Sequence, residues 1–253
     1  MRKYARGIKA FVKWLDGAPA TQAAALGYKA HISKSHAPTS VNSMLAAING
    51  FFAFYALDIK AKPLKIQKKI YSSCDQELTR VEYERLLRAA MQQGNERLSL
   101  VMQTICSTGI RVSELQFVTI EVAKTGRAEV TNKGKTRTIF IPLQLKNALL
   151  RYAKAQGIST GHIFVSKNGK PLNRSNIWTD MKKLCAAANV ASSKVFPHNL
   201  RHLFARCFYG IDKDIVRLAD ILGHSRIDTT RIYVRESGAE HRRRIEQLNL
   251  VMT

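Results

Sequence analysis

One turn signal limits what this chain can fold into. Residues 132–135, Asn-Lys-Gly-Lys, separate two runs of β-forming residues, 127–131 and 136–142, and this pattern predicts a single hairpin. Elsewhere most apolar residues recur every three or four positions, which is the spacing of an amphipathic helix. We therefore expect a mainly α protein with a small antiparallel β-sheet, to which a short strand at 162–165 is added.

The helical pattern divides the chain into two expected domains, residues 1–73 and 74–253. In the first domain, helices are predicted from Tyr4 to Leu15, from Thr21 to Ser33 and from Pro38 to Tyr55, with their aromatic side chains in the core. Residues 58–77 carry many lysines without an apolar period, so a linker is predicted there. Thr79–Glu82 has the pattern of a capping box and begins the second domain, and a further helix is expected over 96–107.

The charge is extreme and it is spread along the chain. Lys and Arg total 41 against 18 Asp and Glu, a net charge of +23. Residues 1–73 alone hold 12 basic and 2 acidic side chains. So large an excess favours a polyanionic partner that both domains contact, although charge alone also fits the basic surface of a ribosomal or membrane-associated protein.

The cysteines and the apolar runs indicate a cytoplasmic protein. Cys74, Cys106, Cys185 and Cys207 form no C-x-x-C pair, so neither a zinc site nor a disulfide framework is expected. No apolar run has the length of a membrane span, and the N-terminus lacks the apolar core of a signal peptide.

Four short segments carry side chains suited to phosphate chemistry. In residues 108–115, Gly109 permits a tight turn and Arg111 lies one helical turn before Glu114, which can hold it as a fork for a phosphate. In residues 198–202, His198 and Arg201 share a helical face. Taken singly, the first pattern is more often a surface salt bridge and the second a solvated face.

The other two segments add a nucleophile and an acid. His224 follows the helix-ending Gly223, and Tyr233 comes nine residues later, after a helix expected to start at Asp228 or Thr229. A lysine on the hairpin turn, Lys133 or Lys135, can reach a leaving oxygen. The ordinary interpretations are a packing tyrosine and a solvated turn lysine.

The order of these segments is far more specific than any one of them. R-x-x-E after a Thr-Gly turn, a lysine hairpin, H-x-L-R-H, L-G-H-S and a tyrosine nine residues on together resemble the catalytic domain of the tyrosine recombinase (phage integrase) family. The resemblance covers residues 78 to 253, and the preceding helices resemble the family's core-binding domain more loosely. The resemblance implies an α+β catalytic domain behind a helical DNA clamp. The chain lacks the arm-binding domain of many phage-type integrases, which suggests either a simple recombinase or a truncated chain.

The resemblance also implies a role for each residue. Arg111 and Arg201 bind the scissile phosphate, His198 and His224 assist through hydrogen bonds and proton transfer, Lys133 is the general acid, and Tyr233 attacks phosphorus to form a 3′-phosphotyrosine. Arg and His take the place of metal ions, so no cofactor and no metal are expected. The implied partners are double-stranded DNA and three further copies of the chain, in a homo-tetramer that holds two DNA sites through a Holliday junction.

Two other functions stay open at this point. A type IB topoisomerase uses similar chemistry as a monomer, but the L-G-H-S segment and the N-terminal helices favour a recombinase. A catalytically idle DNA-binding regulator needs no phenol nucleophile. The target DNA, the need for an accessory DNA-bending factor, and the choice between integration into a mobile element's target, excision, inversion and dimer resolution are not encoded in any motif.

Overall fold

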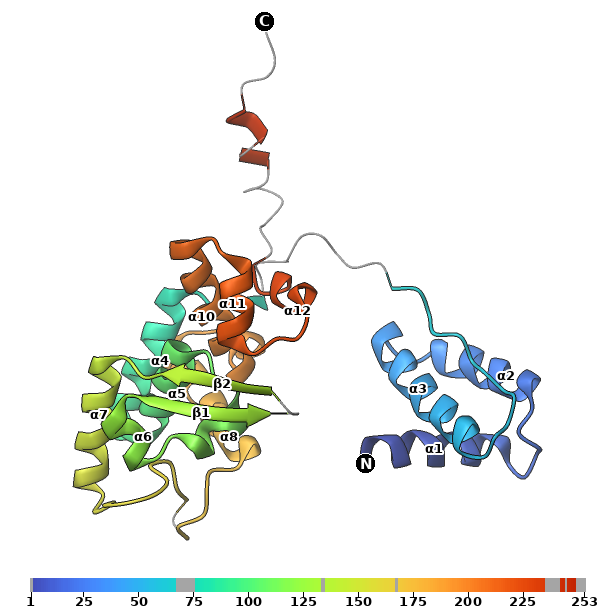
Figure 1. Ribbon diagram of the computed structural model, residues 1–253, viewed down its shortest axis with the longest axis horizontal. Coiled ribbons are helices and arrows are strands. Elements are labelled where there is room, and N and C mark those ends of the chain that lie inside the picture. Colours follow the sequence, from blue (N-terminus) through green and yellow to red (C-terminus); the bar gives the residue numbers. More distant parts are fainter. Residues whose placement is uncertain are drawn as a thin grey trace, which may run out of the picture. The chain divides into compact units, whose positions relative to one another are not determined.

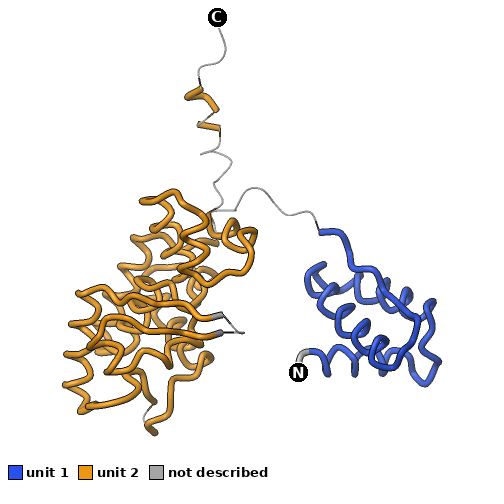
Figure 2. Tube along the Cα trace, viewed as in Figure 1, with its two compact units in different colours: residues 1–69 blue, residues 70–253 orange. Residues whose placement is uncertain are grey.

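The chain forms two compact units, Met1–Lys69 and Ile70–Thr253, each described here by itself (Figure 2). The structure is a computed structural model that describes residues 2–66, 76–132, 135–166, 168–234, 242–243 and 245–248. The predicted class is confirmed, since the described residues are mainly helical with one two-stranded antiparallel sheet (Figure 1). None of the helices within these ranges combines the length and the apolar character that crossing a membrane requires.

The first unit contains three helices where the sequence predicts them: α1 (Arg2–Leu15), α2 (Gln22–Ser33) and α3 (Pro38–Phe54). The Thr21 side chain accepts a hydrogen bond from the Ala24 amide and caps α2, and Pro38 opens α3. The three helices enclose a core of Phe11, Ala25, Tyr28, Ile32, Val41, Leu45, Ile48, Phe52 and Ala61.

The prediction that the aromatic residues of these helices lie in the core is wrong for three of them. Tyr4, Phe54 and Tyr55 are 56%, 82% and 59% exposed, whereas Phe11 and Phe52 are fully buried. The helix α1 approaches α3 at Gly7, where a Cβ atom would lie 3.0 Å from the Cβ of Ala47. The contact face therefore runs through Gly7 and Phe11. Tyr4 shares this face by its spacing, but it lies in the first turn of α1 and is exposed there.

The predicted linker is also wrong in its first half. Residues 58–66, here called the strap, lie extended along the first unit and bury Ala61 completely. The Asn49 amide binds both backbone groups of Ala61 at 2.9 Å, and Asn42 and Gln22 pair in the same way with Leu64 and Lys60. Side-chain amides thus satisfy the strap's backbone, a pairing that a hydrophobicity pattern does not reveal.

The second unit is built around a buried helix. Its elements are α4 (Arg80–Gln92), α5 (Glu96–Thr108), η2 (Val112–Phe117), α6 (Ile120–Thr125), β1 (Arg127–Asn132), β2 (Lys135–Phe140), α7 (Leu143–Ala155), α8 (Arg174–Lys183), α9 (Cys185–Ala188), η3 (Ser192–Lys194), α10 (Pro197–Asp212), α11 (Ile215–Leu222) and α12 (Ile227–Arg231). The helix α5 packs against α4, α7, α8 and α10, which explains why Val101, Met102 and Ile105 are wholly buried. The predicted capping box at Thr79 and Glu82 is confirmed.

The hairpin forms one edge of this unit. Its register pairs Ala128 with Ile139 and Val130 with Arg137, so these four side chains share the inward face. The strand predicted at 162–165 does not form. That segment makes only single bridges, Thr119 to His162 and Val165 to Pro171, because a turn at Gly169 folds the chain back before a ladder can grow.

Candidate active site

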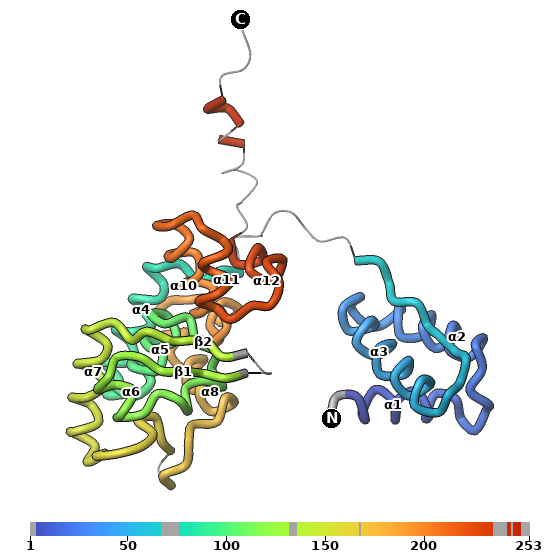
Figure 3. Tube along the Cα trace, in the orientation of Figure 1, coloured from blue at the N-terminus to red at the C-terminus, as the bar shows by residue number. Residues whose placement is uncertain are grey.

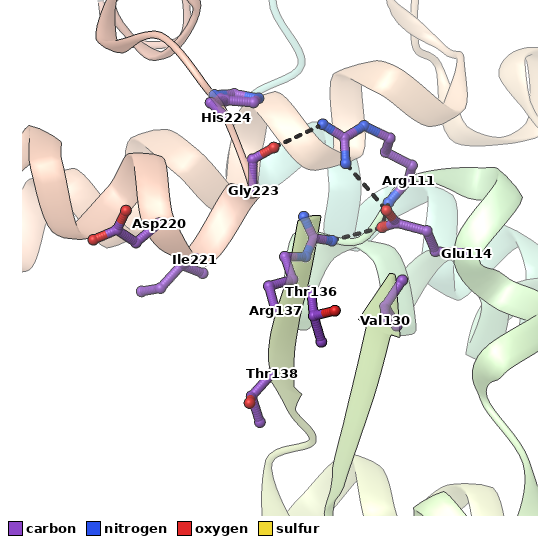
Figure 4. A pocket seen from close by; sticks show the side chains of 10 residues that line it. All are labelled: Arg111, Glu114, Val130, Thr136, Arg137, Thr138, Asp220, Ile221, Gly223 and His224. Atoms are coloured by element: carbon purple, nitrogen blue, oxygen red, sulfur yellow. Dashed lines mark hydrogen bonds and ion pairs between the residues drawn. The ribbon is translucent and has the colours of Figure 1, made fainter. Parts of the chain in front are cut away.

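Five of the six predicted site residues come together where β2, η2 and the ends of α10, α11 and α12 meet. Figure 3 shows that β2 comes from the middle of the chain and that α10, α11 and α12 come from its last third. The sixth residue, Lys133, lies outside the described residues, as does the side chain of Lys135. A cavity of about 540 Å³ opens beside the cluster, lined by Arg111, Arg137 and His224 (Figure 4).

Arg111 is set by the turn that precedes it. Gly109 ends α5 in the left-handed conformation at φ 66°, and a Cβ atom there would lie 2.4 Å from the Phe204 ring. Only glycine satisfies both demands. The chain then enters η2, where Glu114 accepts from the Arg111 backbone at 2.8 Å and from its Nη1 at 3.1 Å. The predicted fork is present, and its side chain is 34% exposed.

Arg201 lies deeper. Pro197 occupies the first turn of α10, as predicted, and Arg201 follows one turn later, 1% exposed. Its Nη1 donates to the carbonyl of Gly109 at 2.5 Å, and its Nη2 donates to the carbonyl of Leu222 at 2.6 Å. Burial, and next the nearby charge of Arg111, lower the pKa of Arg201 to about 10. The guanidinium therefore stays charged at neutral pH.

Carbonyl oxygens at the C-terminal end of α11 accept hydrogen bonds from each of the three arginines of the cluster. The Leu222 carbonyl accepts from Arg201 and also from Arg137, and the Gly223 carbonyl accepts from Arg111 at 3.4 Å. The last carbonyls of a helix have no partner within it and carry the negative end of its dipole. They compensate part of the positive charge that three guanidinium groups concentrate here.

Arg137 is the residue that the motif pattern missed. It donates to Glu114 Oε2 at 2.6 Å and to the carbonyl of Leu222, and its side chain is 10% exposed. A signal was available, because Arg137, Ile139 and Ile141 alternate with Thr138 and Phe140, which places the arginine in the buried row of a strand. An arginine in that row needs a buried partner.

Tyr233 is surrounded by histidines. Its ring lies 5.3 Å from that of His224, 5.6 Å from that of His198 and 4.2 Å from that of His202, and its hydroxyl is 3.4 Å from His198 Nε2. The proximity predicted for His224 and Tyr233 is confirmed. The helix between them, α12, begins earlier than predicted, because Arg226 takes the cap position and Asp228 lies in the first turn.

All three histidines have a lowered pKa. Burial is the largest cause, and Arg201 adds to it at each ring; the pKa falls below 6.5 for His198, to about 4 for His224 and to about 3 for His202. Neutral imidazoles fit the hydrogen bonds, since His224 Nε2 accepts from Arg201 Nη2 at 3.1 Å while Nδ1 faces Thr230 Oγ1 at 2.8 Å. The site thus combines charged arginines with uncharged histidines that can accept protons.

This arrangement suits a phosphodiester substrate. Three guanidinium groups outnumber the two carboxylates at the cavity, Glu114 and Asp220, and leave a positive surplus for an anion. A phenol lies against a proton acceptor. In the part of the chain that the structure describes, no group of three or more His, Cys, Asp or Glu side chains is disposed to hold a metal ion.

Comparison with known proteins agrees with this chemistry. The model of the phage integrase family matches residues 76–240, which contain every site residue described above. The chain belongs to the phage integrase family. The family resemblance inferred from the motif order is confirmed.

Named relatives of this phage integrase family member cover most of the chain. The tyrosine recombinase XerA of Pyrococcus horikoshii is 30% identical over 94% of this chain and 84% of its own length. The tyrosine recombinase XerD of Chlamydia trachomatis is 32% identical over 81% and 73%. These relationships identify a tyrosine-type site-specific recombinase and do not favour the topoisomerase or regulator alternatives.

Solved structures share the fold. A XerH recombinase on a palindromic difH substrate, in a post-cleavage complex, matches with a TM-score of 0.76 and 17% identity over 97% of this chain and 78% of that chain. A λ integrase dimer on a COC′ core site matches with a TM-score of 0.69 and 19% identity, over 93% and 88%. Identities this low support the fold assignment alone.

Proposed function

We propose that this recombinase cuts DNA by attack of the Tyr233 hydroxyl on a backbone phosphorus, which gives a 3′-phosphotyrosine and a free 5′-hydroxyl, and that reversal of this step on a partner strand exchanges the DNA. The observation that carries the proposal is the position of Tyr233, with its hydroxyl 3.4 Å from His198 and its ring 5.3 Å from that of His224, which binds Arg201. Family membership supports it.

Arg111 and Arg201 neutralise the phosphate in this scheme. Charge builds up on the non-bridging oxygens as the phenol attacks, and guanidinium groups fixed in advance stabilise it without having to reorganise. Glu114 and the carbonyls of Gly109 and Leu222 provide that fixation.

His198 accepts the phenolic proton. Its lowered pKa keeps the imidazole neutral at pH 7, so Nε2 has a lone pair free to take the proton as the bond to phosphorus forms. His224 lies next to Arg201, from which its Nε2 accepts; in the tautomer that carries the proton on Nε2, His224 would instead donate a hydrogen bond to the phosphate.

The 5′ oxygen needs a proton to leave, and Lys133 supplies it. A substitution Lys133→Ala should slow cleavage by roughly 10²–10⁴-fold, the range for a positioned acid. A 5′-bridging phosphorothioate, whose thiolate leaves without a proton, should restore most of the rate. Rescue of Lys135→Ala in place of Lys133→Ala would move the acid two residues along the turn.

Tyr233 and Arg201 are 6% and 1% exposed, so DNA has to displace part of this packing before the phosphate can bind. The partners in this proposal follow the family.

Double-stranded DNA binds both basic units, and four copies of the chain hold two DNA sites and pass through a Holliday junction.

Two exposed apolar residues near the C-terminal end support assembly. Ile245 and Leu248 are 56% and 60% exposed and lie one helical turn apart, so the described residues leave them largely uncovered. Docking on a neighbouring copy would cover them and link the copies in a ring. In native gels, Ile245→Ser/Leu248→Ser should keep binding to one site and lose pairing of two sites, with Gln247→Ser as control. Unchanged pairing would contradict this role.

The cleavage proposal is tested with nicked duplexes. Sites are first selected by binding the full chain to a pool of randomised duplexes. A nick placed near the scissile phosphate makes the released piece, which bears the free 5′-hydroxyl, short enough to diffuse away. Rejoining is then prevented, so a covalent protein–DNA adduct should accumulate. A chain that binds the selected duplex tightly and forms no adduct at any nick position would contradict the proposal.

A further inference from the structure

Arg137 lies at the centre of the arginine cluster, although no motif includes it. One of its nitrogens donates to Glu114, and another donates to the carbonyl of Leu222. Figure 4 shows its guanidinium between Glu114 and the end of α11, below that of Arg111. These contacts join residues 23 and 85 positions apart in the sequence.

Each contact of Arg137 is shared with one of the two phosphate-binding arginines. Glu114 holds the backbone and the side chain of Arg111, and the Leu222 carbonyl also accepts from Arg201 at 2.6 Å. Arg137 is therefore the link that connects the support of Arg111 to the support of Arg201. A planar guanidinium fixes both the distance and the angle between two acceptors, which an ammonium group does not.

The backbone around Arg137 is shaped to admit it. A Cβ atom on Gly223 would lie 2.7 Å from Arg137 Nη1 and 2.8 Å from its Cδ. Gly223 also has φ 64°, so this glycine both ends α11 and leaves room for the arginine. The glycine of the L-G-H-S segment thus has a role in the site as well as in the helix end.

Stability alone does not account for this arginine. Its pKa is lowered, first by burial, and the charge of Arg111 lowers it further while Glu114 opposes the change. A buried ion pair costs desolvation that a well-packed apolar side chain would avoid. Val130 and Ile139, its neighbours on the inward face, are apolar, so an apolar residue at this position would continue the core.

We propose that Arg137 is a positioning residue for DNA cleavage: by joining Glu114 to the end of α11, it holds Arg111 and Arg201 at the separation that one phosphate requires. This role rests on the proposed function. It gives Arg137 no contact with the substrate, and it assigns it neither the nucleophile nor the acid step.

The test uses the full chain in single-turnover adduct formation on a selected nicked duplex. The variants are Arg137→Met, which removes the fork and the charge, and Arg137→Lys, which keeps the charge without the fork. The control is Arg127→Met, an exposed arginine on the same hairpin. Each protein reacts with three scissile groups: a normal phosphate, a methylphosphonate that has no negative charge, and a 5′-bridging phosphorothioate.

The expected pattern follows from the chemistry. On the normal phosphate, Arg137→Met should slow adduct formation by about 10²-fold, the loss typical of one removed oxyanion contact. Arg137→Lys should show most of that defect, while Arg127→Met stays near the wild-type rate. On the methylphosphonate, whose transition state carries one negative charge fewer and so depends less on the arginines, the difference from wild type should shrink to about threefold or less. The bridging sulfur should not help Arg137→Met, although it rescues Lys133→Ala.

Three results would overturn the proposal. A defect of equal size on all three groups would assign Arg137 to folding only. Rescue by the bridging sulfur would place its effect on the acid step, and a wild-type rate for Arg137→Lys would mean that charge alone matters. If Arg137→Met does not fold, as judged by its circular dichroism, the Arg137→Lys comparison decides. Failure of the proposed function looks different, since wild type itself then forms no adduct on the normal phosphate.

Discussion

The residues around Tyr233 are unusual in being basic by type yet mostly uncharged. His198, His202 and His224 lie within ring contact of the phenol, and each has a lowered pKa because burial and Arg201 disfavour a further positive charge. The arginines provide the positive field and the histidines remain able to accept protons. This division of roles suits the proposed phosphoryl transfer.

The lowered pKa values predict acid sensitivity. Between pH 6.5 and pH 4 the unfolded chain binds protons at His202 while the folded chain, with a pKa of about 3 there, does not. Stability should therefore be full above pH 6.5 and fall as the pH drops, by at most about 1.4 kcal/mol per pH unit for this group. His202→Phe should flatten the fall.

Urea unfolding between pH 7 and pH 4.5 checks this. Trp178 fluorescence in a Trp14→Phe background reports on the second unit, because the chain has 2 tryptophans. The exposed His31 on α2, replaced by Phe, is the control. The same pH dependence with and without His202 would refute the assignment of a neutral His202.

Local spacing drew attention to five of the site residues, and the order of their segments, which resembles the family, distinguished them from ordinary surface and packing residues. Arg111 follows a glycine turn, His198 and Arg201 share one helical face, and His224 and Tyr233 flank one short helix. Arg137 was not predicted, since both of its partners are distant in the sequence and only the alternation of β2 marks it. Lys133 stays a prediction.

The elements of the site act mainly through their ends. The carbonyls at the end of α11 hold three arginines, the end of α5 holds Arg201 through Gly109, and the start of η2 fixes Arg111. Helix starts and ends were predicted well where Gly, Pro or Thr marks them. The start of α12 was predicted less well, because Arg226 at its cap position is not a typical capping residue. The strap was missed because its backbone is held by side chains of α2 and α3 that are distant in the sequence.

The strap gives a prediction at this scale. Asn49→Ala removes both hydrogen bonds to Ala61 and leaves its buried backbone groups unpaired, which should cost about 1–3 kcal/mol per unsatisfied group. The strap should open locally, so limited proteolysis of the full chain should cut within 58–66 at least several-fold faster. Ser43→Ala, on the same helix without a strap contact, is the control. Equal cleavage rates would show that Asn49 does not hold the strap.

At the scale of the whole molecule, two basic units each have their own core. The net charge could be predicted from the composition, and the helices could be predicted from the spacing of apolar residues. The boundary between the two units was harder to predict, because no sequence pattern shows that residues 58–66 pack on the first unit while Gln76 and Glu77 bond to Asn199 and Arg206 of the second.

Binding by both units predicts a salt dependence. The affinity of the full chain for duplex DNA should fall with salt at a log–log slope of about −0.9 per phosphate neutralised. A fragment of residues 76–253, which retains the contacts of Gln76 and Glu77, should have a shallower slope. Fluorescence anisotropy from about 50 to 300 mM salt measures both slopes. Equal slopes would mean that the first unit does not contact DNA.

The central claim is that Tyr233 is the nucleophile, and a single substitution tests it most directly. Tyr233→Phe removes only the hydroxyl, so the ring contacts with His202 and His224 and the affinity for DNA should persist. On a nicked duplex that wild type converts to a covalent adduct, this variant should bind as tightly and form no adduct within the limit of detection. An adduct formed by Tyr233→Phe at the wild-type rate would contradict the account and direct attention to another tyrosine, beginning with Tyr209.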